Sequence, residues 1–142
     1  MLDPASRIER AFLVQCLALP PEGREAIAEM DIEADITNPS FRRVAALIAA
    51  APPGAELAVP AGDEDLGPVV AELQVRASQA NASPAALGAE RLRLELARTE
   101  REIGAAKGSG GDLVGLVERR EALRAQIERQ VEATLDQSRA AD

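Results

Sequence analysis

The sequence of 142 residues contains no histidine, tryptophan or tyrosine, only one cysteine and only two phenylalanines. Without histidine there is no Ser-His-Asp or Cys-His nucleophile pair and no imidazole ligand for a metal ion. The single Cys16 excludes both a disulfide framework and a thiolate metal cage. Two phenylalanines offer little aromatic surface for stacking on nucleic-acid bases. We therefore predict no catalytic residues, no metal site and no cofactor in this chain.

The charge balance is also one-sided, with 24 acidic against 16 basic side chains and a net charge of -8. Because binding to a phosphate backbone needs clustered lysine and arginine, we expect no direct contact with nucleic acid. No apolar run approaches the roughly 18 residues that span a bilayer. The N-terminus MLDPASRIER lacks the basic-then-apolar order of a signal peptide. These features predict a cytoplasmic protein without membrane contact.

Apolar residues recur at helical spacing along nearly the whole chain, which predicts an all-α fold. Three pairs of a capping residue and a proline predict where helices begin: Asp3-Pro4, Asn38-Pro39 and Ser83-Pro84. Further helices are expected over 22–30 and from about 66 or 68 to 80. The acidic segment DIEADI at 31–36 is predicted to be a loop with two apolar anchors, and the breaker-rich residues 51–65 an exposed loop.

The C-terminal part has a different pattern, in which two heptad-spaced segments flank the glycine-rich sequence GSGG at 108–111. This pattern predicts a long antiparallel helical hairpin. Its second helix should begin at a cap provided by Asp112. The predicted seam residues are Leu92, Leu96, Thr99, Ile103 and Ala106 in the first arm, and Leu116, Arg120, Leu123, Ile127 and Gln130 in the second. Thr99 and Arg120 should form a polar layer that defines the register.

Charge divides the chain at the same place. Residues 1–82 carry 13 acidic and 6 basic side chains, net -7, whereas residues 83–142 carry 11 and 10, net -1. A nearly neutral segment with alternating signs is typical of a solvated coiled coil. We therefore predict two parts, a small helical bundle over 1–82 and the helical hairpin over 83–142.

One acidic segment has the beginning of a calcium-loop pattern, with Asp31, Glu33 and Asp35 at positions 1, 3 and 5. The glycine required at position 6 is Ile36, however, and the bidentate acid required at position 12 is Arg42. The segment is better interpreted as a solvated acidic turn.

The other candidates for chemistry also have plainer explanations. Glu22, Glu25 and Glu29 share one helix face, but nothing beside them suggests the cleft that acid–base catalysis needs. GAAKGSGG at 104–111 lacks the GxxxxGK[ST] order of a phosphate loop. Cys16 lies on an apolar stripe with Phe12, which favours a buried, inert thiol.

Several apolar residues of the hairpin lie outside the predicted seam: Leu94, Val114, Val117, Val131 and Leu135. Each either packs on the bundle or broadens the seam, or belongs to an apolar strip that binds a partner. Val114 and Val117 are the stronger candidates for partner binding because they lie near the turn, farthest from the bundle.

The order of these segments resembles a known family. RIERAFLVQCLALP at 7–20, MDIEADI at 30–36 and TNPSFRRVAALIAA at 37–50, followed by a charged hairpin, resemble the C-terminal, helicase-binding domain of bacterial DNA primase, the DnaG family. The resemblance extends from Arg7 to about Leu135. One departure is Ile36, which stands where relatives often carry an aromatic residue.

The resemblance implies a module that is not itself an enzyme and that couples priming to unwinding. In such primases the zinc-binding and polymerising domains precede this module, which docks on the N-terminal collar of the hexameric, DnaB-type replicative helicase. The bundle of relatives also contacts the acidic tail of single-strand binding protein, which here would require Arg42, Arg43 and Arg76 to gather. We expect a monomer or weak dimer.

Two other functions remain open from the sequence. The N-terminal collar of the replicative helicase itself is similar in fold, with a bundle and a hairpin, and it self-associates. A coiled-coil adaptor unrelated to replication also fits the composition. The sign-alternating hairpin at the end of the chain favours the primase module over the collar.

Overall fold

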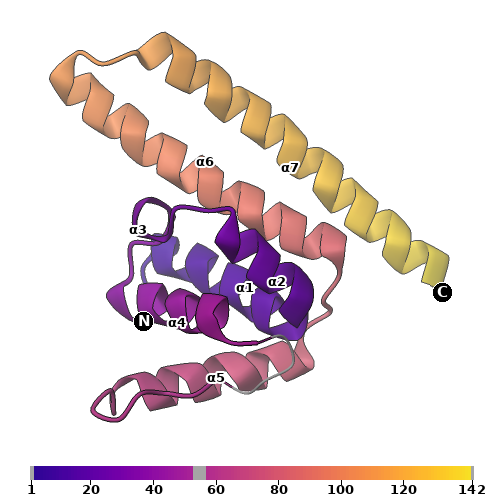
Figure 1. Ribbon diagram of the computed structural model, residues 1–142. Coiled ribbons are helices and arrows are strands. Elements are labelled where there is room, and N and C mark those ends of the chain that lie inside the picture. The colour runs from indigo at the N-terminus through magenta and orange to yellow at the C-terminus, as the bar shows by residue number, and fades with distance from the viewer. Residues whose placement is uncertain (1, 53–56, 142) are drawn as a thin grey trace.

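A computed structural model of the chain describes residues 2–52 and 57–141, and within these ranges it is all-α, as predicted. The helices are α1 Pro4–Ala18, α2 Pro20–Ala28, α3 Ile32–Asp35, α4 Pro39–Ala50, α5 Leu66–Gln79, α6 Pro84–Ser109 and α7 Leu113–Ala141. Helices α1 to α5 gather into a bundle, and α6 and α7 run side by side above it in opposite directions (Figure 1). None of the helices in the described ranges is long and apolar enough to cross a membrane.

Three helix starts follow the predicted capping pairs, whereas the second helix begins at Pro20 and ends at Ala28 instead of extending over 22–30. The Asp3 carboxylate accepts from the Ser6 amide at 3.3 Å, and the Ser83 hydroxyl accepts from the Ala86 amide at 3.0 Å. The side-chain oxygen of Asn38 accepts from the first two amides of α4, at 3.0 and 3.2 Å. Each of these caps satisfies backbone donors that have no partner within the helix. The predicted 51–65 loop contains no helix at the described residues 51–52 and 57–65, and residues 53–56 lie outside the described ranges.

Helix α1 is the centre of the bundle and contacts α2, α4, α5 and α6. Its fully buried Phe12, Leu13 and Cys16 meet Val44 of α4 and Leu73 of α5 in one core. The same core contains Leu87 and Leu94 of α6. The two predicted parts, 1–82 and 83–142, therefore share one core, although the link between α5 and α6 does lie at the predicted boundary near residue 82.

The acidic segment 31–36 differs from the sequence prediction. Instead of an open loop it contains the short helix α3, whose N-terminus is capped by Asp31. Asp35 is only 7% exposed, so the interpretation as a fully solvated turn is wrong at this residue. The reason is tertiary: α3 packs against α6, which carries arginines at this point. The predicted anchor Ile36 is fully buried.

Cys16 is completely buried, as expected from its place on the apolar stripe. Burial penalises the thiolate and raises the pKa of the Cys16 thiol to about 12. We expect iodoacetamide at pH 8 to modify the folded protein about a thousandfold more slowly than the chain unfolded in guanidinium, because only the thiolate reacts. The rate is measured by mass spectrometry, and equal rates in the two states would show that the thiol is accessible.

Helices α6 and α7 form the hairpin, with α7 on the side of α6 that faces away from α1 (Figure 1). In α6 the predicted seam residues Thr99, Ile103 and Ala106 are buried, whereas Leu92 and Leu96 are half-buried. Leu123 is the buried seam residue of α7. Ion pairs join the two arms, between Arg119 and Glu95 at 3.7 Å and between Arg124 and Glu100 at 3.5 Å.

The predicted polar layer is only partly visible in the side-chain contacts. The Thr99 hydroxyl donates to the Glu95 carbonyl of its own helix at 2.8 Å. The Nε of Arg120 is buried and makes no hydrogen bond, while its nearest acid, Glu121 on the same helix, is 3.4 Å away. Arg120 therefore lies at the seam without a hydrogen-bonded partner on the opposite arm at this atom.

Candidate partner-binding surface

The turn of the hairpin projects away from the bundle (Figure 1). Helix α6 continues through Gly108 and Ser109 and ends at Gly110, whose left-handed φ of 72° favours glycine. The Asp112 carboxylate then accepts from the Gly115 amide at 3.1 Å and caps α7, as predicted. The turn thus begins two residues later than the GSGG pattern suggested, because glycine at 108 is tolerated within the helix.

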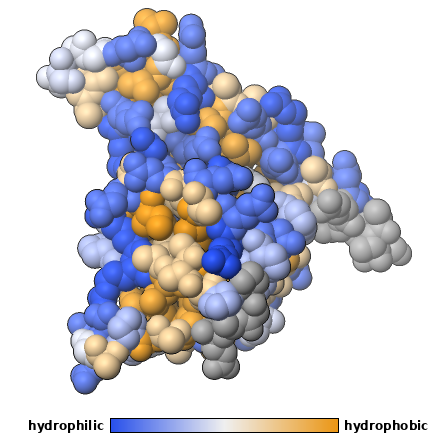
Figure 2. Space-filling view, viewed as in Figure 1, coloured by the Kyte–Doolittle hydropathy of each residue, from blue (hydrophilic) through white to orange (hydrophobic). Residues whose placement is uncertain are grey.

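The first residues of α7 place apolar side chains at this turn. Val114 is 71% exposed and Val117 is half-buried. Figure 2 shows apolar side chains at this end of the hairpin among hydrophilic ones. At the other end of α7, Val131 is half-buried and Leu135 is 50% exposed. Val114, Leu135 and Val75 of α5 are the exposed large apolar residues of the described chain, so two of the three were among the predicted partner residues.

Leu94 does not belong to this surface. It is only 2% exposed and lies in the core shared by α6 and the bundle. Helix α6 is covered by the bundle on one side and by α7 on another, whereas α7 packs only against α6 among its principal contacts. For Leu94 the packing alternative is therefore correct, and it offers no surface to a partner.

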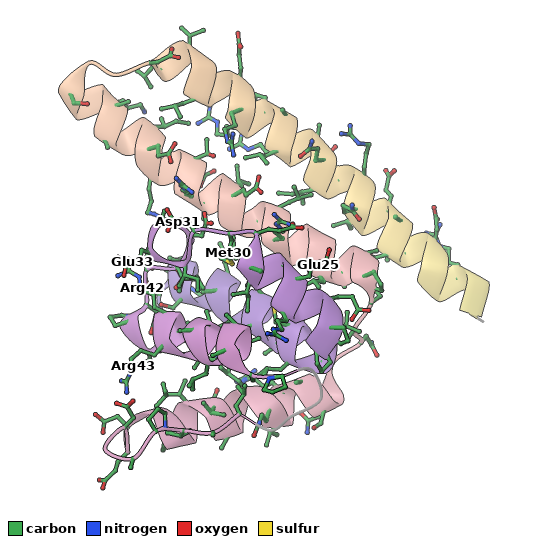
Figure 3. The ribbon with its side chains drawn as sticks, viewed as in Figure 1. Glu25, Met30, Asp31, Glu33, Arg42 and Arg43 are labelled. Atoms are coloured by element: carbon green, nitrogen blue, oxygen red, sulfur yellow. The ribbon has the colours of Figure 1, made fainter. Side chains whose placement is uncertain are left out.

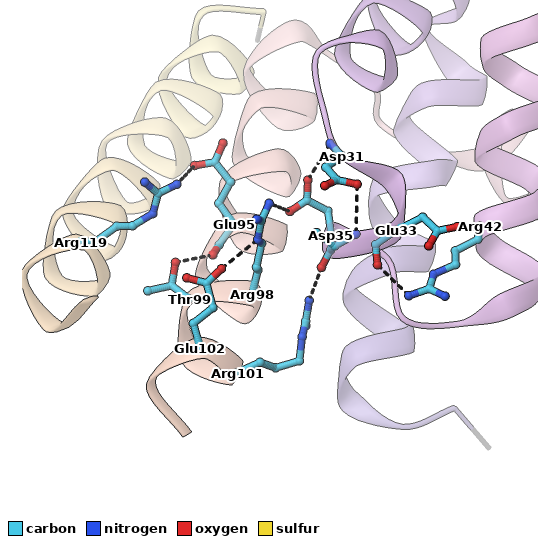
Figure 4. Close-up of polar contacts among 11 residues, drawn as sticks. Asp31, Glu33, Asp35, Arg42, Glu95, Arg98, Thr99, Arg101, Glu102 and Arg119 are labelled. Atoms are coloured by element: carbon cyan, nitrogen blue, oxygen red, sulfur yellow. Dashed lines mark hydrogen bonds and ion pairs between the residues drawn. The ribbon is translucent and has the colours of Figure 1, made fainter. Parts of the chain in front are cut away.

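A second feature is a charged groove between the bundle and the hairpin (Figure 4). Three arginines of α6 face the α2–α3 region. Arg91 pairs with Glu29 at 2.7 Å, Arg98 pairs with Asp35 at 3.3 Å, and Arg101 donates to the Ala34 carbonyl at 2.9 Å. Arg98 also pairs with Glu102 on its own helix, and these acids raise the pKa of the Arg98 guanidinium. We call these three contacts the arginine latch.

The arginine latch joins two parts of the chain that differ in net charge. Acids of the net-negative bundle meet arginines of the hairpin, so the two parts attract one another across their contact. These arginines were not singled out from the sequence. Their positions at 91, 98 and 101, spaced by 7 and 3 residues, indicate that they share one face of α6. The sequence does not indicate that this face lies opposite the acidic segment.

The groove does not have the properties of a catalytic or metal site. Each latch arginine already has an acceptor, and the groove also contains the apolar Met30 and Leu94. In the part of the chain that the structure describes, no group of three or more acidic or cysteine side chains is placed to hold a metal ion. We interpret the groove as the structural contact that positions the hairpin on the bundle.

Arg42, Arg43 and Arg76, which would have to gather to bind an acidic tail, are engaged separately. Arg42 donates to the carbonyls of Ile36 and Glu33, at 2.5 and 2.7 Å, and holds the α3–α4 link in place (Figure 3). Arg43 pairs with Asp63, and Arg76 with Glu72 of its own helix. This arrangement lends no support to a contact with the tail of single-strand binding protein through these residues.

A buried carboxylate that the sequence did not reveal lies at the centre of the bundle. Glu9 is 1% exposed and accepts hydrogen bonds from the Thr37 hydroxyl at 2.7 Å and the Asn38 amide at 2.9 Å. Asn38 in turn donates to the Ser6 hydroxyl at 3.3 Å. In the sequence Glu9 is one of the charged residues of RIER at 7–10, within a helix of apolar periodicity. Its carboxylate is buried only because residues 37–38 pack on α1.

The chain was compared with known proteins in three ways: no family model, no curated protein and no solved structure matches it.

Proposed function

We propose that this chain is a non-catalytic interaction module that docks on the N-terminal collar of a DnaB-type replicative helicase, as the C-terminal domain of a bacterial primase does. The observation that carries the proposal is the exposure of Val114 at the hairpin turn. Together with the half-buried Val117 one turn along α7, Val114 places apolar surface at the end of the projecting hairpin, outside the core shared with the bundle, where another protein could cover it. The resemblance in segment order adds the identity of the partner.

The arrangement of the hairpin supports a docking role mechanically. Contacts between α6 and α7 and the arm-to-arm ion pairs stiffen the hairpin, while Leu87, Leu94 and the arginine latch attach its base to the bundle. A stiff arm presents its apolar end without the loss of chain entropy that a flexible segment would suffer on binding. Movement of the bound turn would be transmitted to the bundle through α6.

The docking proposal predicts the effect of charge at the turn. The double change Val114→Asp and Val117→Asp should weaken binding to the helicase collar at least about tenfold, because carboxylates would be desolvated in an apolar contact. Titration calorimetry with the collar domain of the cognate helicase measures the affinity, and circular dichroism checks that the variant remains helical.

Val75→Asp is the matched control, since Val75 is 57% exposed but lies on α5 of the bundle. Its affinity should equal that of the unaltered chain. No binding heat for the unaltered chain at tens of micromolar would contradict the proposal, and so would equal losses in the two variants. A stable hexamer in light scattering would instead favour the collar of the helicase itself.

A further inference from the structure

A polar layer interrupts the apolar seam of the hairpin near its middle. Ile103 and Ala106 of α6 are buried on the side of this layer toward the turn. Leu123 of α7 is buried on the other side, toward the base, where α6 joins the bundle. Between them the seam contains Thr99, which is buried, and Arg120, which is half-buried. The apolar contacts of the seam therefore fall into two groups.

The register of the two arms brings the polar residues of this layer together. At the base of the hairpin, a Cβ atom on Gly88 would lie 3.6 Å from Nε2 of Gln130. The two helices are antiparallel and rise by the same amount per residue, about 1.5 Å. Counting along both arms from this contact therefore places Thr99 next to Arg120.

The polar layer does not hold the two arms together. The Thr99 hydroxyl donates to the Glu95 carbonyl of its own helix. The buried Nε of Arg120 has no hydrogen-bond partner in the described chain, and the acid nearest to it, Glu121 at 3.4 Å, lies on the same helix. A polar residue that fixes the register of a coiled coil does so by pairing with the opposite helix. A buried donor without a partner instead costs free energy, so this layer weakens the seam.

The two groups of apolar contacts are also supported unequally. On the side of the base, Leu87 and Leu94 of α6 belong to the core of the bundle. On the side of the turn, Ile103 and Ala106 are buried outside that core. Both arm-to-arm ion pairs are between partly exposed side chains and contribute little to the contact. The turn half of the hairpin therefore depends on a small apolar contact between two arms.

We propose that the polar layer divides the hairpin into two cooperative units, and that its turn half, residues 103–116, opens while the base half stays packed. The open state is a minor one, on the order of 1% of the molecules, so the closed hairpin remains the principal state. The inference concerns the chain alone and does not depend on the proposed helicase contact.

Opening changes the surface that the end of the hairpin presents. It hydrates the Nε of Arg120, which offsets part of the cost of exposing Ile103 and Ala106 to water. In the open state these two residues extend the apolar surface around Val114 and Val117. A partner that binds this larger surface more tightly than the closed one would shift the population toward the open state. Arg120 thus sets how readily the end of the hairpin adapts to a partner.

Two equally buried positions, one on each side of the layer, test the opening. Ile103 and Leu123 are each 4% exposed. Iodoacetamide should modify the new thiol of an Ile103→Cys chain at least about tenfold faster than that of a Leu123→Cys chain, because opening of the turn half exposes only the first. Mass spectrometry after proteolysis separates each new thiol from the buried Cys16, and circular dichroism checks that both variants are helical.

Arg120→Leu tests whether the polar layer causes the opening. An apolar residue there makes the seam continuous, so the modification of Ile103→Cys should slow at least about tenfold, while that of Leu123→Cys changes by less than about twofold. Arg129→Leu, the same change at an exposed position of α7, is the control and should alter neither rate.

Hydrogen exchange provides a measurement that needs no introduced cysteine. In the unaltered chain the amides of residues 103–116 should exchange at least about tenfold faster than those of residues 87–96, and Arg120→Leu should slow them. Equal modification rates at positions 103 and 123 would overturn the proposal. So would an Arg120→Leu chain in which residues 103–116 open as often as before.

Discussion

Replacing Gly23 with alanine is expected to destabilise the protein by about 3 kcal/mol, because the added methyl group would collide with the backbone of α1. A Cβ atom at this position would lie 2.4 Å from both the Cα and the carbonyl oxygen of Cys16, and 2.8 Å from its carbonyl carbon. These are backbone atoms of α1, so no side chain can rotate aside. Helices α1 and α2 would have to separate, which would open the core around Phe12 and Ile27.

Thermal unfolding followed by circular dichroism measures this loss, and for a chain of this size we expect a fall in Tm of about 6–12 °C. Gly104→Ala is the matched control. A Cβ atom there meets nothing within 4 Å, and the residue lies inside α6, so alanine should stabilise the protein by about 0.5–1 kcal/mol. A loss of stability for Gly23→Ala and a gain for Gly104→Ala would show that the effect at Gly23 comes from the close approach of α1 and α2. A Gly23→Ala protein as stable as the unaltered chain would mean that α1 and α2 are not in contact here.

Glu9→Ala is expected to cost about 3 kcal/mol, because it removes a buried acceptor on which two donors depend. The Thr37 hydroxyl and the Asn38 amide would lose their partner in a site closed to water. Asn38 also caps α4 and donates to Ser6, so the connection between α1 and the start of α4 would loosen with it.

Glu9→Gln separates the shape of the side chain from its charge. Its amide oxygen can still accept from the Asn38 amide while its NH₂ group donates to the Thr37 hydroxyl, so we expect a loss of about 1 kcal/mol. Glu22→Gln, on an exposed residue of α2, is the control and should change stability by less than about 0.5 kcal/mol. Urea unfolding gives the free energies. Equal stability of the Glu9→Ala and Glu22→Gln proteins would show that Glu9 is hydrated.

Most helix boundaries could be predicted from the sequence because they depend on neighbouring residues. Asp3, Asn38 and Ser83 cap helices through atoms two or three residues away, and the prolines that follow them require no distant contact. The heptad spacing of the last two helices predicted which of their residues turn inward, and Ile103, Ala106 and Leu123 are buried accordingly.

The exposure of the apolar residues of the hairpin was harder to predict. Heptad spacing indicates which residues share a face of a helix, but not what covers that face. Val114 and Leu135 are exposed because α7 is the outer arm of the hairpin, whereas Leu94 is buried because α6 is the inner one. Which arm touches the bundle depends on the packing of Leu87 and Leu94 against α1. The residues of either helix considered alone do not show which of the two contacts the bundle.

The sequence by itself thus determined the all-α class, the starts of α1, α4, α6 and α7, and the absence of histidine and paired cysteine chemistry, since these follow from residue types and short-range hydrogen bonds. Only the tertiary structure decided which polar groups are buried. Glu9 is closed off by residues 37–38, and Asp35 is closed off by its pairing with Arg98, 63 residues farther along the chain. Burial is a property of the elements that pack over a residue, and those elements come from distant parts of the chain.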